Sequence, residues 1–202
     1  MNFRQALRSL IATVAFAAAS HAGAAVLQVN SAGILTGATG VTVLGKQYDV
    51  TFADTSCNAI YNGCSASAFT FNTLSTAAVA AQALLDQVFL DGAAGQFDSL
   101  PNKTFGCTLD ILCVTNIPYA LYTSGWMGMG SVNYSAAYGG ADYAGSSNNG
   151  AATDFTTAIA YNFAVFKLST PAPANAAIPE PGSIALMGLA LAALAFARRR
   201  KA

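Results

Sequence analysis

The sequence predicts a small, β-rich α+β domain with one packed helix, flanked by a cleavable N-terminal signal and a short C-terminal transmembrane helix. Residues 48–52 alternate apolar and polar side chains, which is the period of a half-buried strand. Residues 76–90 contain no Gly or Pro and repeat apolar side chains at helical spacing. Elsewhere, short apolar runs alternate with clusters of Gly, Asn and Pro, as in strands joined by turns. About 150 residues remain between the two ends, which is enough for one domain with its own core.

The first 24 residues are typical of a secretory signal peptide. Arg4 and Arg8 form a basic start, residues 10–19 are apolar, and Ala22 to Ala24 provide an A-x-A-like cleavage site. A first transmembrane helix is the alternative, but the apolar run is short and small residues follow it. We therefore expect cleavage after Ala24 and an exported domain over residues 25–169.

The first half of that domain is expected to hold short strands and the helix. The expected strands cover residues 26–29, 40–44, 48–52 and 69–71. In the helix, Ala81 and Leu84 belong to an apolar face that has to pack against the strands. Thr73 or Ser75 can cap the N-terminus of the helix, and Gly92 suits the position after its C-terminus.

The second half is expected to alternate strands and loops. The expected order is a loop over 95–108, one or two strands over 111–124, a Gly-punctuated strand or turn over 126–134, and a long strand over 155–168. Residues 138–152 are a low-complexity mixture of Gly, Ala, Ser and Asn, which predicts a flexible surface loop. The long strand is inferred because Phe155, Ile159, Tyr161 and Phe163 fall on one face at period two.

Four cysteines lie in the exported domain, at Cys57, Cys64, Cys107 and Cys113. An even number of cysteines in an oxidising compartment predicts two disulfides. Three connectivities are possible, and proximity favours Cys57–Cys64 and Cys107–Cys113. A four-thiolate metal site is the alternative, but the spacings of six and five intervening residues are wider than those of the usual zinc pair. We expect disulfides, with no metal and no cofactor.

The C-terminal end has three parts in a fixed order. A Pro-rich linker over residues 170–182 contains Pro179, Glu180 and Pro181, and residues 183–202 hold an apolar run followed by a basic cluster. The run from 184 to 197 has 14 uncharged residues, so as a helix it covers roughly 21 Å, against about 30 Å for a bilayer core. The basic cluster consists of Arg198, Arg199, Arg200 and Lys201. By the positive-inside rule this cluster stays in the cytoplasm, which leaves the domain outside the inner membrane.

This order of Pro-Glu-Pro, short apolar helix and arginine cluster resembles the PEP-CTERM sorting signal of Gram-negative bacteria. The resemblance implies recognition by exosortase, a membrane-embedded cysteine protease that removes the tail. It also implies a biofilm or exopolysaccharide context, with the protein reaching the cell surface or extracellular matrix after processing. An ordinary C-terminal tail anchor behind a Pro-rich linker is the alternative.

Charge and composition exclude several classes of function. Between residues 25 and 178, three lysines stand against eight aspartates, which gives a net charge of −5 and argues against binding to nucleic acid. The single histidine, His21, lies in the signal peptide, and all five arginines lie in the signal peptide or the tail. Catalysis by a Ser-His-Asp or Cys-His arrangement therefore has no base, and no arginine is present to clamp a phosphate.

Four aromatic residues are the candidates for binding. Trp126, Tyr134, Tyr138 and Tyr143 cluster around Gly-rich turns, where exposed rings could stack on sugars. Alternatively, Trp126 and Tyr134 are ordinary core residues. The leading hypothesis is a non-enzymatic envelope or extracellular-matrix protein. A carbohydrate-binding module that uses these aromatic turns is the second, and a hydrolase that relies on aspartates alone is the third.

Overall fold

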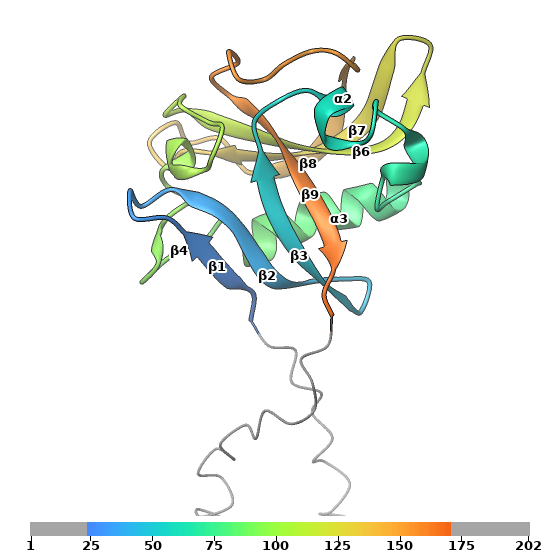
Figure 1. Cartoon of the computed structure of the whole chain (residues 1–202). Coiled ribbons are helices and arrows are strands. Elements are labelled where there is room, and N and C mark those ends of the chain that lie inside the picture. Colours follow the sequence, from blue (N-terminus) through green and yellow to red (C-terminus); the bar gives the residue numbers. More distant parts are fainter. Residues whose placement is uncertain (1–23, 171–202) are drawn as a thin grey trace, which may run out of the picture. The chain divides into compact units, whose positions relative to one another are not determined.

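The computed structural model describes residues 24–170, which form one mixed sheet of seven strands with a helix packed on it (Figure 1). The strand order is β1-β2-β3-β9-β6-β7-β8. Every neighbouring pair is antiparallel except β6 and β9, which are parallel. The strands are β1 (Val26–Val29), β2 (Leu35–Val43), β3 (Lys46–Ala53), β6 (Leu112–Tyr122), β7 (Gly125–Tyr134), β8 (Tyr143–Gly150) and β9 (Tyr161–Leu168). The predicted signal peptide and the predicted transmembrane helix lie outside the described residues.

The first three strands form a meander, as the alternating pattern predicted. Leu44 and Gly45 connect β2 to β3 with φ angles of 50° and 74°, the left-handed conformation that a two-residue hairpin turn requires. The predicted strands at 26–29 and 48–52 are present, and the one at 40–44 is the end of the longer β2. The strand expected at 69–71 is wrong: Phe69 and Phe71 are buried in two different apolar clusters without pairing to a strand.

The predicted helix is α3 (Leu74–Gln87), and it lies across one face of the sheet (Figure 1). Its N-cap is Thr73, whose hydroxyl accepts a hydrogen bond from the backbone N–H of Thr76 at 3.2 Å. The helix ends at Gln87, so Gly92 is not its C-terminal glycine and belongs instead to β4. Alanines dominate the buried face of α3, which lets the helix backbone approach the sheet closely.

Short elements fill the connections before and after α3. They are the helix α2 (Cys57–Ile60), the 3₁₀ turns η1 (Ala66–Ala68) and η2 (Pro101–Lys103), and the two-residue strands β4 (Asp91–Gly92) and β5 (Gly95–Gln96). The strand β5 and the turn η2 lie in the segment 95–108 that was predicted as a loop, and β4 lies just before it. Both disulfides that proximity favoured are present, with Cα–Cα distances of 5.0 Å for Cys57–Cys64 and 5.7 Å for Cys107–Cys113.

Two predictions for the second half are wrong. Residues 138–152 are not a continuous flexible loop, because 143–150 form β8 and pair with β7 over eight consecutive positions. The long strand expected over 155–168 begins only at Tyr161. Phe155 and Ile159 precede it in a loop, so the period-two pattern there was accidental. In the middle of β9, Asn162, Phe163 and Ala164 are all buried, because both faces of the central strand are covered.

The two faces of the sheet carry separate apolar clusters. The larger one lies between the sheet and α3 and includes Val50, Leu84 and Ile117. The smaller one gathers Trp126, Phe163 and other aromatic side chains around the Cys57–Cys64 disulfide on the opposite face. Within residues 24–170, no helix is long and apolar enough to cross a bilayer.

Candidate functional site

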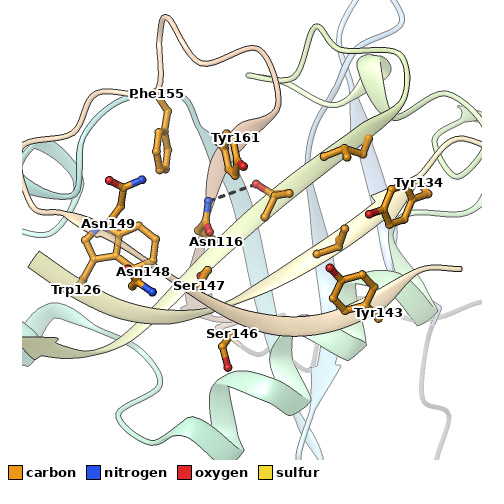
Figure 2. A pocket seen from close by; sticks show the side chains of 13 residues that line it. Asn116, Trp126, Tyr134, Tyr143, Ser146, Ser147, Asn148, Asn149, Phe155 and Tyr161 are labelled. Atoms are coloured by element: carbon orange, nitrogen blue, oxygen red, sulfur yellow. Dashed lines mark hydrogen bonds between the residues drawn. The ribbon is translucent and has the colours of Figure 1, made fainter. Parts of the chain in front are cut away.

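A cavity of about 440 Å³ lies on the sheet face opposite α3, over β6, β7 and β8. Its volume falls within the range typical of ligand pockets, roughly 300–1,000 Å³. Figure 2 shows Trp126 and Asn149 at one end of the cavity and Tyr134 and Tyr143 at the other. The remaining lining residues are Leu112, Val114, Asn116, Val132, Ser146, Ser147, Asn148, Phe155 and Tyr161.

Three glycines lie beneath the cavity and make room for the side chains that line it. Gly130 on β7 pairs directly with Gly145 on β8, and Gly128 pairs with Ser147. A Cβ at Gly128 would lie 2.9 Å from the Cζ3 atom of Trp126, and one at Gly145 would lie 2.7 Å from the ring of Tyr143. Both aromatic rings therefore lie flat along their own strands, over positions that only glycine leaves open.

Three tyrosines form the aromatic end. The rings of Tyr134 and Tyr138 stack with centroids 5.4 Å apart, and the ring of Tyr143 lies 6.4 Å from that of Tyr134. Tyr138 and Tyr143 are 61% and 49% exposed, so the ring faces that do not pack on Tyr134 and Gly145 are available to a ligand. The loop that brings Tyr138 to this end is held by Asp142, whose Oδ1 accepts a hydrogen bond from the Tyr134 N–H at 2.7 Å.

The carboxyl of Asp142 is itself perturbed. Desolvation raises its pKa, and the neighbouring carboxyl of Asp98 raises it further, against the lowering effect of the Tyr134 N–H. The group lies behind the tyrosines and is not part of the cavity lining, where no aspartate is present among the described residues. The cavity is thus uncharged.

The other end is polar. Asn116 is held by its Nδ2 atom, which donates to the carbonyl oxygens of Asn162 at 2.8 Å and Val114 at 3.3 Å (Figure 2 shows one of these bonds). The Oδ1 atom of Asn149 accepts from the Gly150 N–H at 3.0 Å, which leaves its amide N–H groups to donate elsewhere. This end can therefore offer both amide and hydroxyl groups to a ligand.

Two buried polar atoms among the lining residues have no partner. They are the Nε1 atom of Trp126 and the Oγ atom of Ser147. An unpartnered buried donor or acceptor costs about 1–3 kcal/mol, so such groups are rare unless they serve another purpose. Their place in a concave, uncharged site is what a ligand with several hydroxyl groups could exploit.

The structure places the four predicted aromatic residues on this one face but gives them different roles. Trp126 is only 1% exposed and packs edge-on against Phe155 and Phe163, so it is a core residue, as one of the two alternatives predicted, and its ring is not exposed for stacking. Tyr134, Tyr138 and Tyr143 do form one cluster at the cavity rim.

Sequence reasoning missed the polar end of the cavity and the role of the glycines beneath it. Asn116, Ser147, Asn149 and Tyr161 come from three strands, and their proximity depends on the register of the sheet. One signal was available. Every second residue from 126 to 134 lies on the same face of the strand, and these residues are Trp, Gly, Gly, Val and Tyr. Aromatic side chains therefore stand at both ends of this face, with small residues between them.

Residues 24–170 contain no cluster of three or more side chains suited to hold a metal ion. Two pairs of carboxyl groups influence each other, Asp98 with Asp142 and Asp54 with Asp154. Desolvation and then Asp154 raise the pKa of Asp54. Neither pair reaches the cavity, so the aspartate-only hydrolase gains no support from the geometry.

The C-terminal residues match a known sorting motif. Residues 177–201 match the family model of the PEP-CTERM protein-sorting motif. The chain carries the sorting motif of PEP-CTERM proteins. The match includes the predicted sorting residues Pro179, Glu180 and Pro181 and the basic cluster 198–201, all of which lie outside the described residues. The motif identifies an exported protein that is anchored in a membrane and then processed by exosortase. No curated protein and no solved structure matches the chain.

Proposed function

We propose that this PEP-CTERM protein is a non-enzymatic component of the cell surface or extracellular matrix and that its domain binds an exopolysaccharide in the cavity over β6, β7 and β8. The observation that carries the proposal is the shape and chemistry of that cavity. Glycines beneath it make room for the side chains of its lining, exposed tyrosine rings stand at one end, and uncharged amides and a hydroxyl stand at the other.

A sugar ring has an apolar face of C–H groups and a rim of hydroxyl groups, and the cavity offers a counterpart to each. Tyr138 and Tyr143 are exposed and present flat apolar surfaces for stacking. Asn149 has amide donors to spare, and Ser147 and Trp126 each carry a buried polar atom without a partner. Hydrogen bonds from a bound sugar would satisfy these atoms, which water or protein otherwise has to do.

The charge of the domain narrows the class of glycan. No charged side chain lines the cavity, so nothing there pairs with a carboxylate or sulfate group on the ligand. The net charge of −5 between residues 25 and 178 repels a polyanion at distances within about 10 Å at 0.1 M salt. We therefore infer that the ligand is a neutral polysaccharide.

The sorting motif supports the location. A domain released outside the cell by exosortase meets the polysaccharides that the same cell secretes. Weak binding at each cavity is sufficient for retention in a matrix, because a polymer repeats its binding unit many times.

The binding test uses the processed protein from its own host and measures retardation in gels that contain the secreted polysaccharide. Replacing Tyr143 with Ala is expected to reduce retardation at least fivefold. Tyr122→Ala is the matched control, because Tyr122 is 42% exposed against 49% for Tyr143 but lies outside the cavity. If the unmodified protein is not retarded by any neutral polysaccharide from the host, or if both variants bind like it, the proposed binding is wrong.

The sorting test compares hosts with and without exosortase. Mass spectrometry is expected to show loss of the segment after the Pro-Glu-Pro motif only where exosortase is present, with the shortened protein in the surface or matrix fraction. An intact tail in the inner membrane of both strains would mean a simple anchor.

A further inference from the structure

We propose that the free edge of β8 pairs with β8 of a second copy of this chain, in antiparallel orientation about a two-fold axis. The inference does not depend on glycan binding. It rests on the unpaired outer backbone groups of β8 and on the absence of charged residues, prolines and bulges in that strand.

The strand β8 is the last in the sheet order and has a neighbour on one side only. It pairs with β7 at eight consecutive positions, from Val132↔Tyr143 to Gly125↔Gly150, without a shift in register. In an antiparallel ladder, every second residue directs its N–H and C=O away from the partner strand. Among residues 24–170, the outer side of β8 bonds to a residue outside the strand only at its end, where the Gly150 carbonyl accepts from the Thr153 N–H at 3.1 Å.

Proteins normally protect such an edge, and β8 carries none of the usual protection. Edge strands are blunted by short length, by lysine or proline, or by a β-bulge. The opposite edge, β1, has two of these features: it is four residues long, and its register shifts between Gln28 and Val29. The strand β8 is twice as long, regular, and without a charged residue or proline.

The occupant that fits this edge is the same strand from another copy. A strand paired with itself in antiparallel orientation satisfies each outward N–H and C=O with the matching group of the partner. The strand is uncharged, so two copies do not repel each other along it. If Ser146 faces Ser146, the flanking Asp142 of each copy lies opposite Gly150 of the other. The two carboxylates are then eight residues or about 26 Å apart along the strand, well beyond a Debye length of about 10 Å.

This pairing has a geometric consequence. Residues opposite each other in an antiparallel pair project to the same face of the sheet, so the two-fold axis runs perpendicular to the sheet. Both cavities then open on the same face, one on each side of the new ladder, because Tyr143 and Ser147 of each cavity lie on β8 itself. A dimer built this way presents two binding sites to one polymer.

The first test uses the full chain in its own cells. A photo-crosslinking residue, p-benzoylphenylalanine, replaces Asn148, which is exposed on β8, or Gln28 on β1 as the matched control at the other edge. Illumination is expected to give a species of twice the mass from the variant at 148 and not from the one at 28, with both crosslinked peptides from this chain. The proposal is overturned if no adduct forms or if the only adduct is with another protein. It is also overturned if the variants at 148 and 28 give equal amounts of adduct.

The second test measures dimerisation of the processed protein by light scattering across a range of concentrations. Ser146→Lys places a charge on the exposed middle of β8 and is expected to weaken the dimer at least tenfold, while Gln28→Lys leaves it unchanged. Circular dichroism confirms that both variants stay folded. A dimer of equal strength in Ser146→Lys, or a wild-type protein that stays monomeric at 100 times its working concentration in the binding assay, contradicts the inference. Gel retardation of the wild-type protein is scored separately, so a wild-type protein that is retarded but stays monomeric overturns this inference and leaves the proposed function standing.

Discussion

Replacing Trp126 with phenylalanine tests whether the cavity was built to hold a polar ligand. The indole is 1% exposed, and its Nε1 atom has no hydrogen-bond partner. Phenylalanine keeps an aromatic ring against Phe163, 5.3 Å away in the present packing, but removes the N–H group and part of the ring. The variant therefore separates the packing role of the side chain from its capacity to donate.

The two effects on stability oppose each other. Removing a buried donor without a partner is worth about 1–3 kcal/mol in favour of folding. Losing part of a well-packed ring costs a similar amount, since complete truncation of a buried Phe or Trp to Ala costs about 3–5 kcal/mol. We expect Trp126→Phe to change the free energy of unfolding by no more than about 1.5 kcal/mol, and Trp126→Ala to lower it by about 3–5 kcal/mol.

The effect on binding has no such compensation. A net hydrogen bond is worth about 0.5–1.5 kcal/mol, so the loss of the donor should weaken polysaccharide binding about 2- to 12-fold. Stability is measured by urea unfolding followed by circular dichroism, because the substitution removes the single tryptophan. Binding is measured by gel retardation.

Two results would refute this reasoning. If Trp126→Phe is as destabilising as Trp126→Ala, the Nε1 group is not an unpaired burden in the folded state. If stability behaves as expected but retardation is unchanged, the Nε1 group does not serve the ligand, and the tyrosine end alone carries binding.

Three further predictions concern the stability of the domain and are checked by urea unfolding. Changing both Cys57 and Cys64 to Ser opens a loop with a sequence separation of seven and should cost about 2 kcal/mol; an unchanged midpoint would show that the bridge is dispensable. Asp142→Asn should raise stability at pH 7. The folded-state pKa of this carboxyl is raised by desolvation and by Asp98. The protonated carboxyl therefore stabilises the folded state fully below the unfolded-state pKa of about 3.9, and this stabilisation is lost as the pH rises through the folded-state pKa. The variant should therefore also show a flatter dependence of the midpoint on pH between 3.5 and 7, and a lower midpoint at pH 7 would contradict this sign. Thr73→Ala removes the N-cap of α3 and should cost about 1 kcal/mol, whereas Thr73→Asp should restore most of it.

The parts of the fold that the sequence predicted are those that local rules determine. The helix α3 was predictable because 14 residues without Gly or Pro follow a capping Thr73. The strand β3 was predictable because one of its faces is partly exposed and the other is buried, which produces alternation. The two disulfides were predictable because each closes a short loop.

The parts that failed depend on distant partners. The strand β8 consists of residues with low strand propensity, and its extended form is maintained by β7 on one side and by contact with α3. The beginning of β9 was placed too early because the buried Phe155 lies in the preceding loop and happens to keep the period of the strand. No local pattern distinguishes such a residue from a member of the strand.

The candidate site shows the same division between local and distant information. The tyrosine cluster could be expected from the sequence, because Tyr134, Tyr138 and Tyr143 surround one Gly-rich connection. The polar end could not, because Asn116 and Ser147 are 31 positions apart in the sequence and meet only through the β6–β7–β8 register. For Trp126 the sequence left a binding role and a core role open, and the structure shows the core role because its strand turns this side chain toward the smaller apolar cluster around the Cys57–Cys64 disulfide.

The glycines of β7 do not mark a flexible connection, although a glycine-rich composition favours that interpretation. Glycine weakens a strand, and a glycine-rich stretch is normally interpreted as a flexible connection. Here, Gly128 and Gly130 lie inside a ten-residue strand, on the face opposite Met129 and Ser131, which pack toward α3. The face toward α3 supplies the stability of the strand, so the other face can leave two successive positions empty. Gly128 and Gly130 thus make room for the side chains of Trp126 and Val114, which line the hollow in which we place the ligand.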